Sequence, residues 1–287
     1  MSGENDPMEA EGQRGDEERE DDYVDRAKPE ILDVILQQRL VTDREIKVRL
    51  ERSFFPWVVD RAIKRLRAEG KVRNVGDKGR KRKGAPELFY TLNEIQYDSI
   101  IGILNRKKRV SFEVNSVLTK YSPAGTHAED LFEEALGSLG FEIKGRDVSE
   151  YKGRKAKGVF GKQLPNLDFV VERDRIAYGI DVKNWIRYEY TTRYEVASKV
   201  SVALELGLIP FILARYVSKD AMFNEVIQKG GLCYPYKTLL LSSTYESLAT
   251  EAGGLLGYPI IAVDVLPAHK AAKVDELHEY MRSRLKK

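Results

Sequence analysis

The sequence predicts an α/β fold in which helices flank a mixed sheet, preceded by a smaller domain of three helices and a β-hairpin. From residue 126 onward, helix-like and strand-like segments alternate, which is typical of an α/β layer architecture. Residues 29–92 instead contain three helical segments followed by two strand-like runs. The 287 residues exceed the roughly 100 to 200 residues of one domain, so two domains are expected.

Cysteine usage and hydropathy exclude several classes of protein. A single cysteine, Cys233, rules out a disulfide within the chain, and none of the histidines has zinc-ligand spacing with it. The most apolar stretch, residues 202–217, falls short of the ~18 uninterrupted apolar residues of a membrane span. The start, MSGENDPMEAEG, lacks the features of a signal peptide. These observations favour a soluble cytoplasmic protein with no membrane partner. The three histidines are His127, His269 and His278.

Charge is distributed unevenly along the chain. The net charge is only +3, but residues 1–25 contain eleven acidic residues against two arginines. With so few large apolar residues, this segment is predicted to be a disordered acidic tail. We expect it to bind a protein partner or to shield basic surface. The remaining body is basic, which favours a polyanionic partner, although solvated charge explains many basic surfaces.

Residues 26–95 are predicted to form a winged helix-turn-helix domain. The first helix begins at Pro29, the second has Thr42 as its N-cap, and the third, residues 55–70, stops at Gly70. Two strands, KVRNV and ELFYTL, then flank a loop rich in glycine and basic residues. Three helices followed by a hairpin is the order of a winged helix-turn-helix domain.

Basic residues of this domain fall where such a domain meets DNA. Three lie away from the apolar stripe of the third helix, the element that enters the major groove in helix-turn-helix proteins. Five more lie at the hairpin tip, within reach of flanking phosphates. Neither group is balanced by nearby acids in the sequence, so DNA binding is favoured over a solvated face or a protein contact. The candidate DNA-binding residues are Arg61, Lys64, Arg65, Lys78, Arg80, Lys81, Arg82 and Lys83.

Residues 96–122 are predicted to be a helical linker, because IQYDSIIGILNRKKRV has helical periodicity and is followed by a turn at Pro123 and Gly125. Residues 123–287 are predicted to form the α/β domain. Its predicted order is a helix from Thr126, a strand at 141–148, a hairpin at 167–185, a helix from Arg193, and further alternating elements that end in a basic helix.

The predicted hairpin, LDFVVERDRIAYGIDVKNW, has apolar runs that are interrupted by charged residues. With Arg173 and Asp174 in a two-residue turn, antiparallel pairing places Asp168 opposite Gly179. Because directly opposed residues point to the same side, Asp168 then shares a face with every second residue after Gly179. Phe169, Val171, Ile180 and Val182 fall on the other face and are predicted to pack into a core.

Asp181 and Lys183 follow Gly179 by two and four positions, so three charges converge on one face with Asp168. Two neighbouring carboxylates repel each other, and a hard divalent cation such as Mg²⁺ relieves this by accepting oxygens from both. A lysine beside them could orient a water molecule or stabilise developing negative charge. The alternative is a surface hairpin in which Asp181 and Lys183 form a modest ion pair.

The segment PNLD, followed thirteen residues after its aspartate by DVK, resembles the bipartite motif of the PD-(D/E)XK nuclease superfamily, which has the restriction-endonuclease-like fold. The resemblance covers roughly residues 122–217. It implies that Asp168 and Asp181 bind Mg²⁺ or Mn²⁺, that the carbonyl of Val182 is a further ligand, and that Lys183 assists the attacking water. One departure is that Pro165 precedes the aspartate by three residues instead of one.

Glu129 is the candidate for the acidic residue that this resemblance places on an upstream helix. It lies three residues before Phe132 and seven before Leu136, so it extends the buried stripe of its helix toward the sheet. The alternative is structural, since Thr126 and Glu129 also fit a capping box. Further along, Glu195 and Lys199 have the spacing of an ordinary helix ion pair.

The sequence therefore favours a Mg²⁺- or Mn²⁺-dependent DNA endonuclease, targeted to duplex or branched DNA by the winged helix. A non-catalytic DNA-binding scaffold or regulator on the same fold, and a junction or RNA nuclease, stay open as alternatives. Nucleases that cut both strands are often dimers, so a homodimer is a further expectation. The sequence does not indicate which residues would form the interface.

Overall fold

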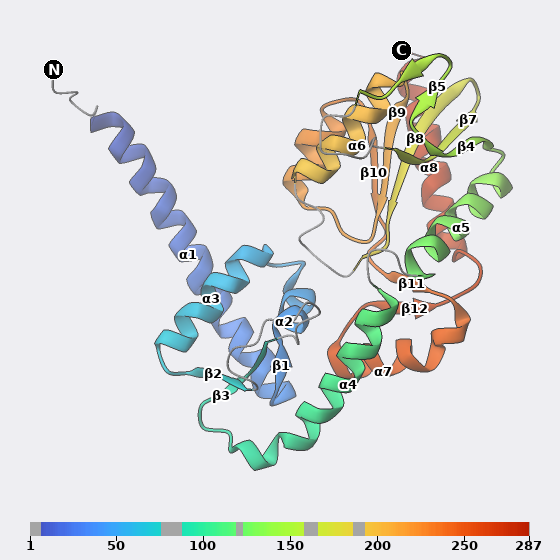
Figure 1. Cartoon of the computed structure of the whole chain (residues 1–287). Coiled ribbons are helices and arrows are strands. Elements are labelled where there is room, and N and C mark those ends of the chain that lie inside the picture. The colour runs from blue at the N-terminus through green and yellow to red at the C-terminus, as the bar shows by residue number, and fades with distance from the viewer. Residues whose placement is uncertain (1–6, 76–87, 119–122, 158–165, 186–192, 287) are drawn as a thin grey trace. The chain divides into compact units, whose positions relative to one another are not determined.

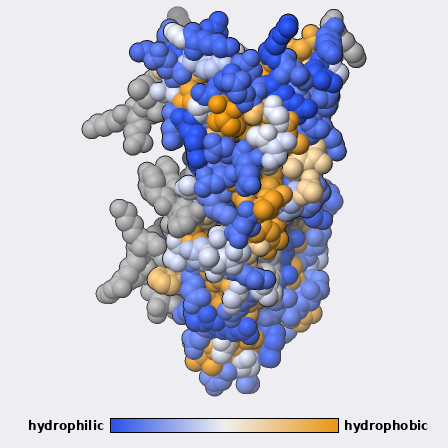
Figure 2. All heavy atoms as spheres, turned by 90° about the vertical axis from the view of Figure 1, so that its right-hand side faces the viewer, coloured by the Kyte–Doolittle hydropathy of each residue, from blue (hydrophilic) through white to orange (hydrophobic). Residues whose placement is uncertain are grey.

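The computed structural model describes residues 7–75, 88–118, 123–157, 166–185 and 193–286, without the side chains of residues 7–20, 123 and 193. Two compact units make up the chain. Unit 1 comprises Met1–Phe112 and Glu251–Tyr258, and unit 2 comprises Glu113–Thr250 and Pro259–Lys287. No helix in the described part of the chain is long and apolar enough to cross a membrane. Seen from the right-hand side of Figure 1, the surface is mostly hydrophilic, with apolar residues in scattered patches (Figure 2).

Unit 1 contains helices around a small antiparallel sheet of order β1-β3-β2 (Figure 1). Apolar residues of the first three helices and all three strands share one core. The elements are α1 (Pro7–Gln38), β1 (Val41–Thr42), α2 (Asp43–Leu50), α3 (Pro56–Ala68), β2 (Val72–Val75), β3 (Phe89–Leu92), the 3-10 helix η1 (Tyr97–Ser99) and α4 (Ile101–Val117), which continues into unit 2.

Local sequence signals set the helix ends in unit 1. Thr42 caps α2, accepting a hydrogen bond from the backbone of Glu45, whose side chain in turn accepts one from the backbone of Thr42. The buried carboxylate of Glu45 also pairs with the buried ammonium of Lys107 at 2.6 Å. Pro56 opens α3, and Gly70 follows its end with a φ of 71°, as a C-terminal glycine can. The predicted second and third helices and both predicted strands are confirmed.

Two expectations for helix starts in this region are wrong. The first helix does not begin at Pro29 but runs from Pro7 through it, including residues that we expected to be disordered. Val24 and Ala27 continue the buried stripe of Ile31, which accounts for the part of the helix between Val24 and Pro29. The predicted connecting helix begins at Ile101, after η1, instead of near residue 95.

Unit 2 is built on a mixed five-stranded sheet of order β10-β9-β8-β7-β4. Strands β8, β9 and β10 run parallel to one another, while β7 is antiparallel to both of its neighbours, β8 and β4. The α/β class and the mixed sheet flanked by helices are therefore confirmed. The strands are β4 (Glu142–Val148), β7 (Leu167–Arg173), β8 (Ile176–Lys183), β9 (Ile209–Ala214) and β10 (Leu232–Pro235).

Helices cover both faces of this sheet (Figure 1). Apolar residues of α5 (Pro123–Ser138) and α8 (Ala268–Leu285) pack on one face, together with Phe169, Val171, Ile180 and Val182, as predicted. Residues of α6 (Arg193–Glu205) and the π-helix η3 (Ala221–Ile227) pack on the other. The remaining elements are the hairpin β5 (Glu150–Tyr151) and β6 (Arg154–Lys155), the parallel pair β11 (Leu239–Leu241) and β12 (Ile260–Ala262), the 3-10 helix η4 (Ser243–Tyr245) and α7 (Glu246–Leu256).

Candidate functional site

The turn between β7 and β8 determines which residues face each other across the hairpin. Asp174 and Arg175 form it, with φ values of 52° and 64°, and two such residues give a turn whose twist matches the strands. Val170, and not Asp168, therefore lies opposite Gly179, so the predicted register is wrong by two positions. Because strand side chains alternate with a period of two, this shift leaves the predicted faces unchanged.

Asp168, Asp181 and Lys183 meet at the open end of this hairpin. Regular pairing ends at Phe169 and Ile180, and the next position on each strand is an aspartate. The Lys183 ammonium lies 2.8 Å from Asp181 Oδ1 and 3.7 Å from Asp168 Oδ2. The backbone N–H of Val182 donates a 2.6 Å hydrogen bond to Asp168 Oδ2, so the carboxylate takes the place of a strand partner. The structure thus brings together the three charges that the sequence singled out.

A second lysine, Lys199 of α6, completes this charge cluster. Its ammonium lies 2.8 Å from Asp181 Oδ1 and donates a 2.6 Å hydrogen bond to the carbonyl of Asn166. The sequence predicts an ordinary helix pair of Lys199 with Glu195, and the structure adds these two contacts, which were not predicted from the sequence. A signal was present in the sequence: Lys199 lies three residues after Val196 and four before Ala203, on the buried side of its helix.

Burial and opposite charge set the protonation of this cluster. Burial acts to raise the pKa of Asp181, but the ammonium groups of Lys183 and Lys199 outweigh it, so this pKa lies below its ordinary value. Burial, followed by the charge of Asp181, raises the pKa of Asp168. Burial acts to lower the pKa of Lys183, yet the two aspartates hold it above its ordinary value. Asp181 and Lys183 are thus an ionised pair at neutral pH.

Glu129 faces the same cluster from α5. Burial, followed by the charge of Asp168, raises the pKa of Glu129 to about 7, while Lys183 acts in the opposite direction. The capping-box alternative does not hold, because α5 begins at Pro123 and Thr126 therefore lies inside the helix. Glu129 is half-buried beside the core residue Ala128.

The buried amide of Asn184 fixes the start of α5 against the end of β8. Its Nδ2 donates hydrogen bonds to the carbonyls of Ala124, at 2.9 Å, and Leu240, at 2.6 Å. Its Oδ1 accepts from the backbone N–H of Leu240 and from the hydroxyl of Tyr236. The end of β8, the start of α5 and strand β11 are thereby joined by one side chain, which the sequence did not single out.

The donors at this end of the hairpin suit a hard divalent cation. Glu129, Asp168, Asp181 and the carbonyl of Val182 offer oxygen atoms only, as Mg²⁺ and Mn²⁺ prefer. The two aspartates already attract two ammonium groups, which shows that the cluster favours positive charge. Among the described residues, however, these three carboxylates do not have ligand atoms all within 4.8 Å of one another. Binding of one metal ion by all three would therefore require these carboxylates to move closer together.

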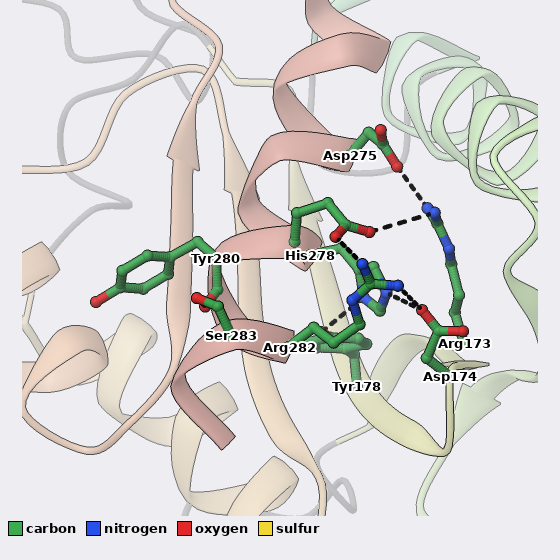
Figure 3. Close-up of polar contacts among 9 residues, drawn as sticks. Arg173, Asp174, Tyr178, Asp275, His278, Tyr280, Arg282 and Ser283 are labelled. Atoms are coloured by element: carbon green, nitrogen blue, oxygen red, sulfur yellow. Dashed lines mark hydrogen bonds and ion pairs between the residues drawn. The ribbon is translucent and has the colours of Figure 1, made fainter. Parts of the chain in front are cut away.

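A separate polar cluster joins the turn of the hairpin to α8, as the side chains in Figure 3 show. The hydroxyl of Tyr178 lies 2.9 Å from His278 Nδ1, and His278 Nε2 lies 3.1 Å from Asp174 Oδ2. Tyr178 precedes Gly179 by one residue, so it lies on the sheet face opposite to Asp181.

Asp174, His278 and Glu279 place ligand atoms within 4.8 Å of one another, but arginines already hold the two carboxylates. Arg282 contacts Asp174 at 3.1 Å and Glu279 at 2.5 Å. Arg173 lies 3.7 Å from Glu279. With two guanidinium groups in place, the cluster is a structural clamp between the turn and α8.

Three of the candidate DNA-binding residues lie on described parts of α3. Arg61 and Lys64 are exposed, and the Arg61 guanidinium lies 5.0 Å from the ring centre of Trp57. Arg65 forms ion pairs with Asp21 and Asp25 of α1, so the expectation that no acid balances this helix is wrong. The other five, Lys78, Arg80, Lys81, Arg82 and Lys83, lie outside the described residues.

No family model, curated protein or solved structure matches this chain. The structure supplies two aspartates, one glutamate and two lysines at one end of the β7–β8 hairpin, and a basic helix in unit 1.

Proposed function

We propose that this chain is a metal-dependent DNA endonuclease of the PD-(D/E)XK type, and that unit 1 is a winged helix-turn-helix domain that binds the DNA. The observation that carries the proposal is the contact of Lys183 with both Asp168 and Asp181 at the end of the β7–β8 hairpin. An ion pair on a solvated hairpin would not need two carboxylates that are largely shielded from water. All three side chains are at least four-fifths buried, which is where charge has the largest effect on a reaction.

In this proposal Glu129, Asp168, Asp181 and the carbonyl of Val182 hold Mg²⁺ or Mn²⁺. When bound, such a cation polarises the scissile phosphate and lowers the pKa of a bound water. The backbone N–H of Val182 holds the Asp168 carboxylate in one orientation. Lys183, kept as an ammonium ion by two aspartates, donates a hydrogen bond to the attacking water and offsets charge that develops on the phosphate.

Lys199 acts as a positioning residue in the same proposal. Its ammonium bridges Asp181 Oδ1 and the carbonyl of Asn166, two residues before Asp168, and so links β8 to the start of β7. It also keeps Asp181 ionised, because an adjacent positive charge favours the carboxylate form.

Unit 1 has the elements that a winged helix-turn-helix domain requires. Three helices precede β2 and β3, and β1 adds a third strand to their sheet. Along α3, Trp57, Arg61 and Lys64 are exposed at helical spacing on the side opposite to the buried Val58, Ala62 and Leu66. An exposed, basic helix face of this kind suits the phosphates and base edges of a DNA groove.

One observation favours the alternative of a non-catalytic DNA-binding scaffold. Asp181 already has two ammonium partners, so its charge is balanced without any metal. The two functions differ in metal affinity, which calorimetry measures directly. An endonuclease should bind Mn²⁺ with an affinity that Asp181→Asn lowers by about tenfold or more, whereas a scaffold should show no heat that this substitution removes.

The substrate class is tested with a panel of labelled nucleic acids in Mg²⁺ or Mn²⁺. The panel contains single-stranded DNA, duplex DNA, a flap, a four-way junction and a duplex RNA. Metal-dependent cutting of DNA that Asp168→Asn abolishes supports the proposal, with Asp275→Asn as a matched change in the ion pair to Arg173. Cutting of RNA or junctions alone would move the assignment to those alternatives, and absence of cutting across the panel would contradict the enzyme.

A further inference from the structure

The acidic beginning of the chain meets the basic face of α3 at one residue. Asp21 and Asp25 of α1, four positions apart and so on one side of the helix, both pair with the guanidinium of Arg65. Asp25 Oδ1 lies 3.1 Å from Arg65 Nη1. These contacts lower the pKa of Asp25, after a first contribution from Lys28, and raise that of Arg65. An arginine proposed to meet DNA is therefore held by two carboxylates of the same chain.

Core packing holds these carboxylates in place. Val24 and Ala27 of α1 are fully buried in the core of unit 1, and the hydroxyl of Tyr23 donates a 2.7 Å hydrogen bond to the carbonyl of Ser53. One turn further along, Lys28 pairs with Glu69 beyond the end of α3 at 2.6 Å. The two aspartates thus sit on a part of α1 that is fixed in unit 1 between them, at Tyr23 and Val24, and just after them, at Ala27 and Lys28.

The ion pairs themselves are exposed to solvent. About a third of the Arg65 side chain and more than half of each aspartate side chain are accessible. Exposed pairs of this kind are individually weak and are screened by salt. A phosphate, which is also an acceptor for a guanidinium fork, can therefore replace the carboxylates, at a cost in affinity.

We propose that Asp21 and Asp25 form an autoinhibitory contact that competes with nucleic-acid phosphate for Arg65. The proposal rests on the proposed DNA-binding function of unit 1. Residues 1–25 contain eleven acidic residues and two arginines, and their negative charge also repels a polyanion such as DNA. DNA binding then requires Arg65 to exchange its carboxylate partners for a phosphate.

The test compares two double variants of the full chain that remove the same charge. Asp21→Asn with Asp25→Asn removes the contact, whereas Glu30→Gln with Asp33→Asn removes two exposed acids further along α1, where Asp33 accepts a hydrogen bond from Gln37. Affinity for a 30-base-pair duplex is measured by fluorescence anisotropy over a salt series, with EDTA present to prevent cleavage. Thermal unfolding of each variant is recorded alongside.

We expect the Asp21/Asp25 variant to bind about threefold or more tightly at low salt, because Arg65 then contacts a phosphate without first losing its carboxylate partners, and the gain should shrink as salt screens the carboxylates. The Glu30/Asp33 variant should show a smaller change. In an Arg65→Gln background, removing Asp21 and Asp25 should have no more effect than the control, because the competed group is gone.

Two results would overturn the inference alone while DNA binding persists. One is an unchanged Kd for the Asp21/Asp25 variant, with or without a fall in its unfolding temperature, which would make the contact structural. The other is a gain in affinity that survives in the Arg65→Gln background. If neither the unmodified chain nor the variant binds duplex at any salt concentration, the proposed DNA-binding function falls together with the inference.

Discussion

Lys199 of α6 and Asp181 of β8 are joined by a 2.8 Å ion pair that neither residue's neighbours in sequence would predict. The side chain of Asp181 is 3% exposed and that of Lys199 is 20% exposed, so the pair is mostly shielded from water. Lys183 contacts the same oxygen of Asp181 at 2.8 Å. One oxygen of Asp181 thus contacts the ammonium groups of two lysines, Lys183 of β8 and Lys199 of α6.

Lys199→Met should weaken both stability and cleavage. Because Asp181 keeps Lys183 as a partner, we expect the free energy of unfolding to fall by about 1–3 kcal/mol, less than for a buried charge left alone. Cleavage should fall by about tenfold or more as the carboxylate loses its position. Urea denaturation and a cleavage assay measure the two effects. Lys229→Met, which breaks the more exposed pair with Glu225, is the matched control, and equal effects from both variants would contradict the role of Lys199.

His278→Ala should destabilise unit 2 without changing its chemistry. The substitution leaves the buried hydroxyl of Tyr178 without its partner and opens a cavity in the core, for an expected loss of about 2–4 kcal/mol. Tyr280→Ala on the same helix is the control, since Tyr280 is 56% exposed and points away from the clamp (Figure 3). Chemical denaturation should show a change of about 0.5 kcal/mol or less for that variant. Equal losses would mean that the clamp contributes no stability.

Asp174 should make stability depend on pH in the acid range. Hydrogen bonds from His278 and then Arg282 lower the pKa of Asp174 below its ordinary 3.8. The folded state therefore binds this proton less readily than the unfolded state, so the stabilisation is present above pH 3.8 and is lost as pH falls through the folded pKa. The difference in urea midpoint between the unmodified chain and Asp174→Asn should shrink between pH 6 and pH 3. A difference that stays constant would contradict the assignment.

Cys233 should be unreactive while the protein is folded. Burial raises the pKa of its thiol to about 12 from 9.0. The thiolate fraction at pH 8 is then roughly a thousandfold lower than for a free cysteine. Modification by a thiol-specific disulfide reagent should follow unfolding, and its rate should rise with urea. Rapid, stoichiometric reaction in the absence of urea would show that Cys233 is accessible.

Features that depend on local pattern could be predicted from the sequence. The Thr42 cap, the Gly70 stop and the alternation of Phe169 and Val171 against Asp168 are set by neighbouring residues, and all three appear as predicted. The meeting of Asp168, Asp181 and Lys183 could also be predicted. It depends on which residues alternate onto the same face of each strand, and not on which two residues form the turn.

Features that depend on contacts distant in sequence could not be predicted. The turn residue Asp174 is held by His278 and Arg282, which lie about a hundred residues away and outside the sequence of the hairpin. In the same way, the partner of Lys199 lies on a strand and the partners of Arg65 lie on α1, whose buried stripe extends past Pro29 toward the N-terminus.

The most direct test of the proposed endonuclease is the nicking of supercoiled plasmid by Lys183→Ala, with DNA affinity measured in parallel. Loss of the ammonium that contacts both Asp168 and Asp181 should lower the cleavage rate by about 100- to 1,000-fold, with Kd for DNA within about threefold of the unmodified chain. Lys229→Ala should cut at the unmodified rate. Metal-dependent nicking that survives in Lys183→Ala, or DNA binding with no nicking by the unmodified chain, would contradict the account.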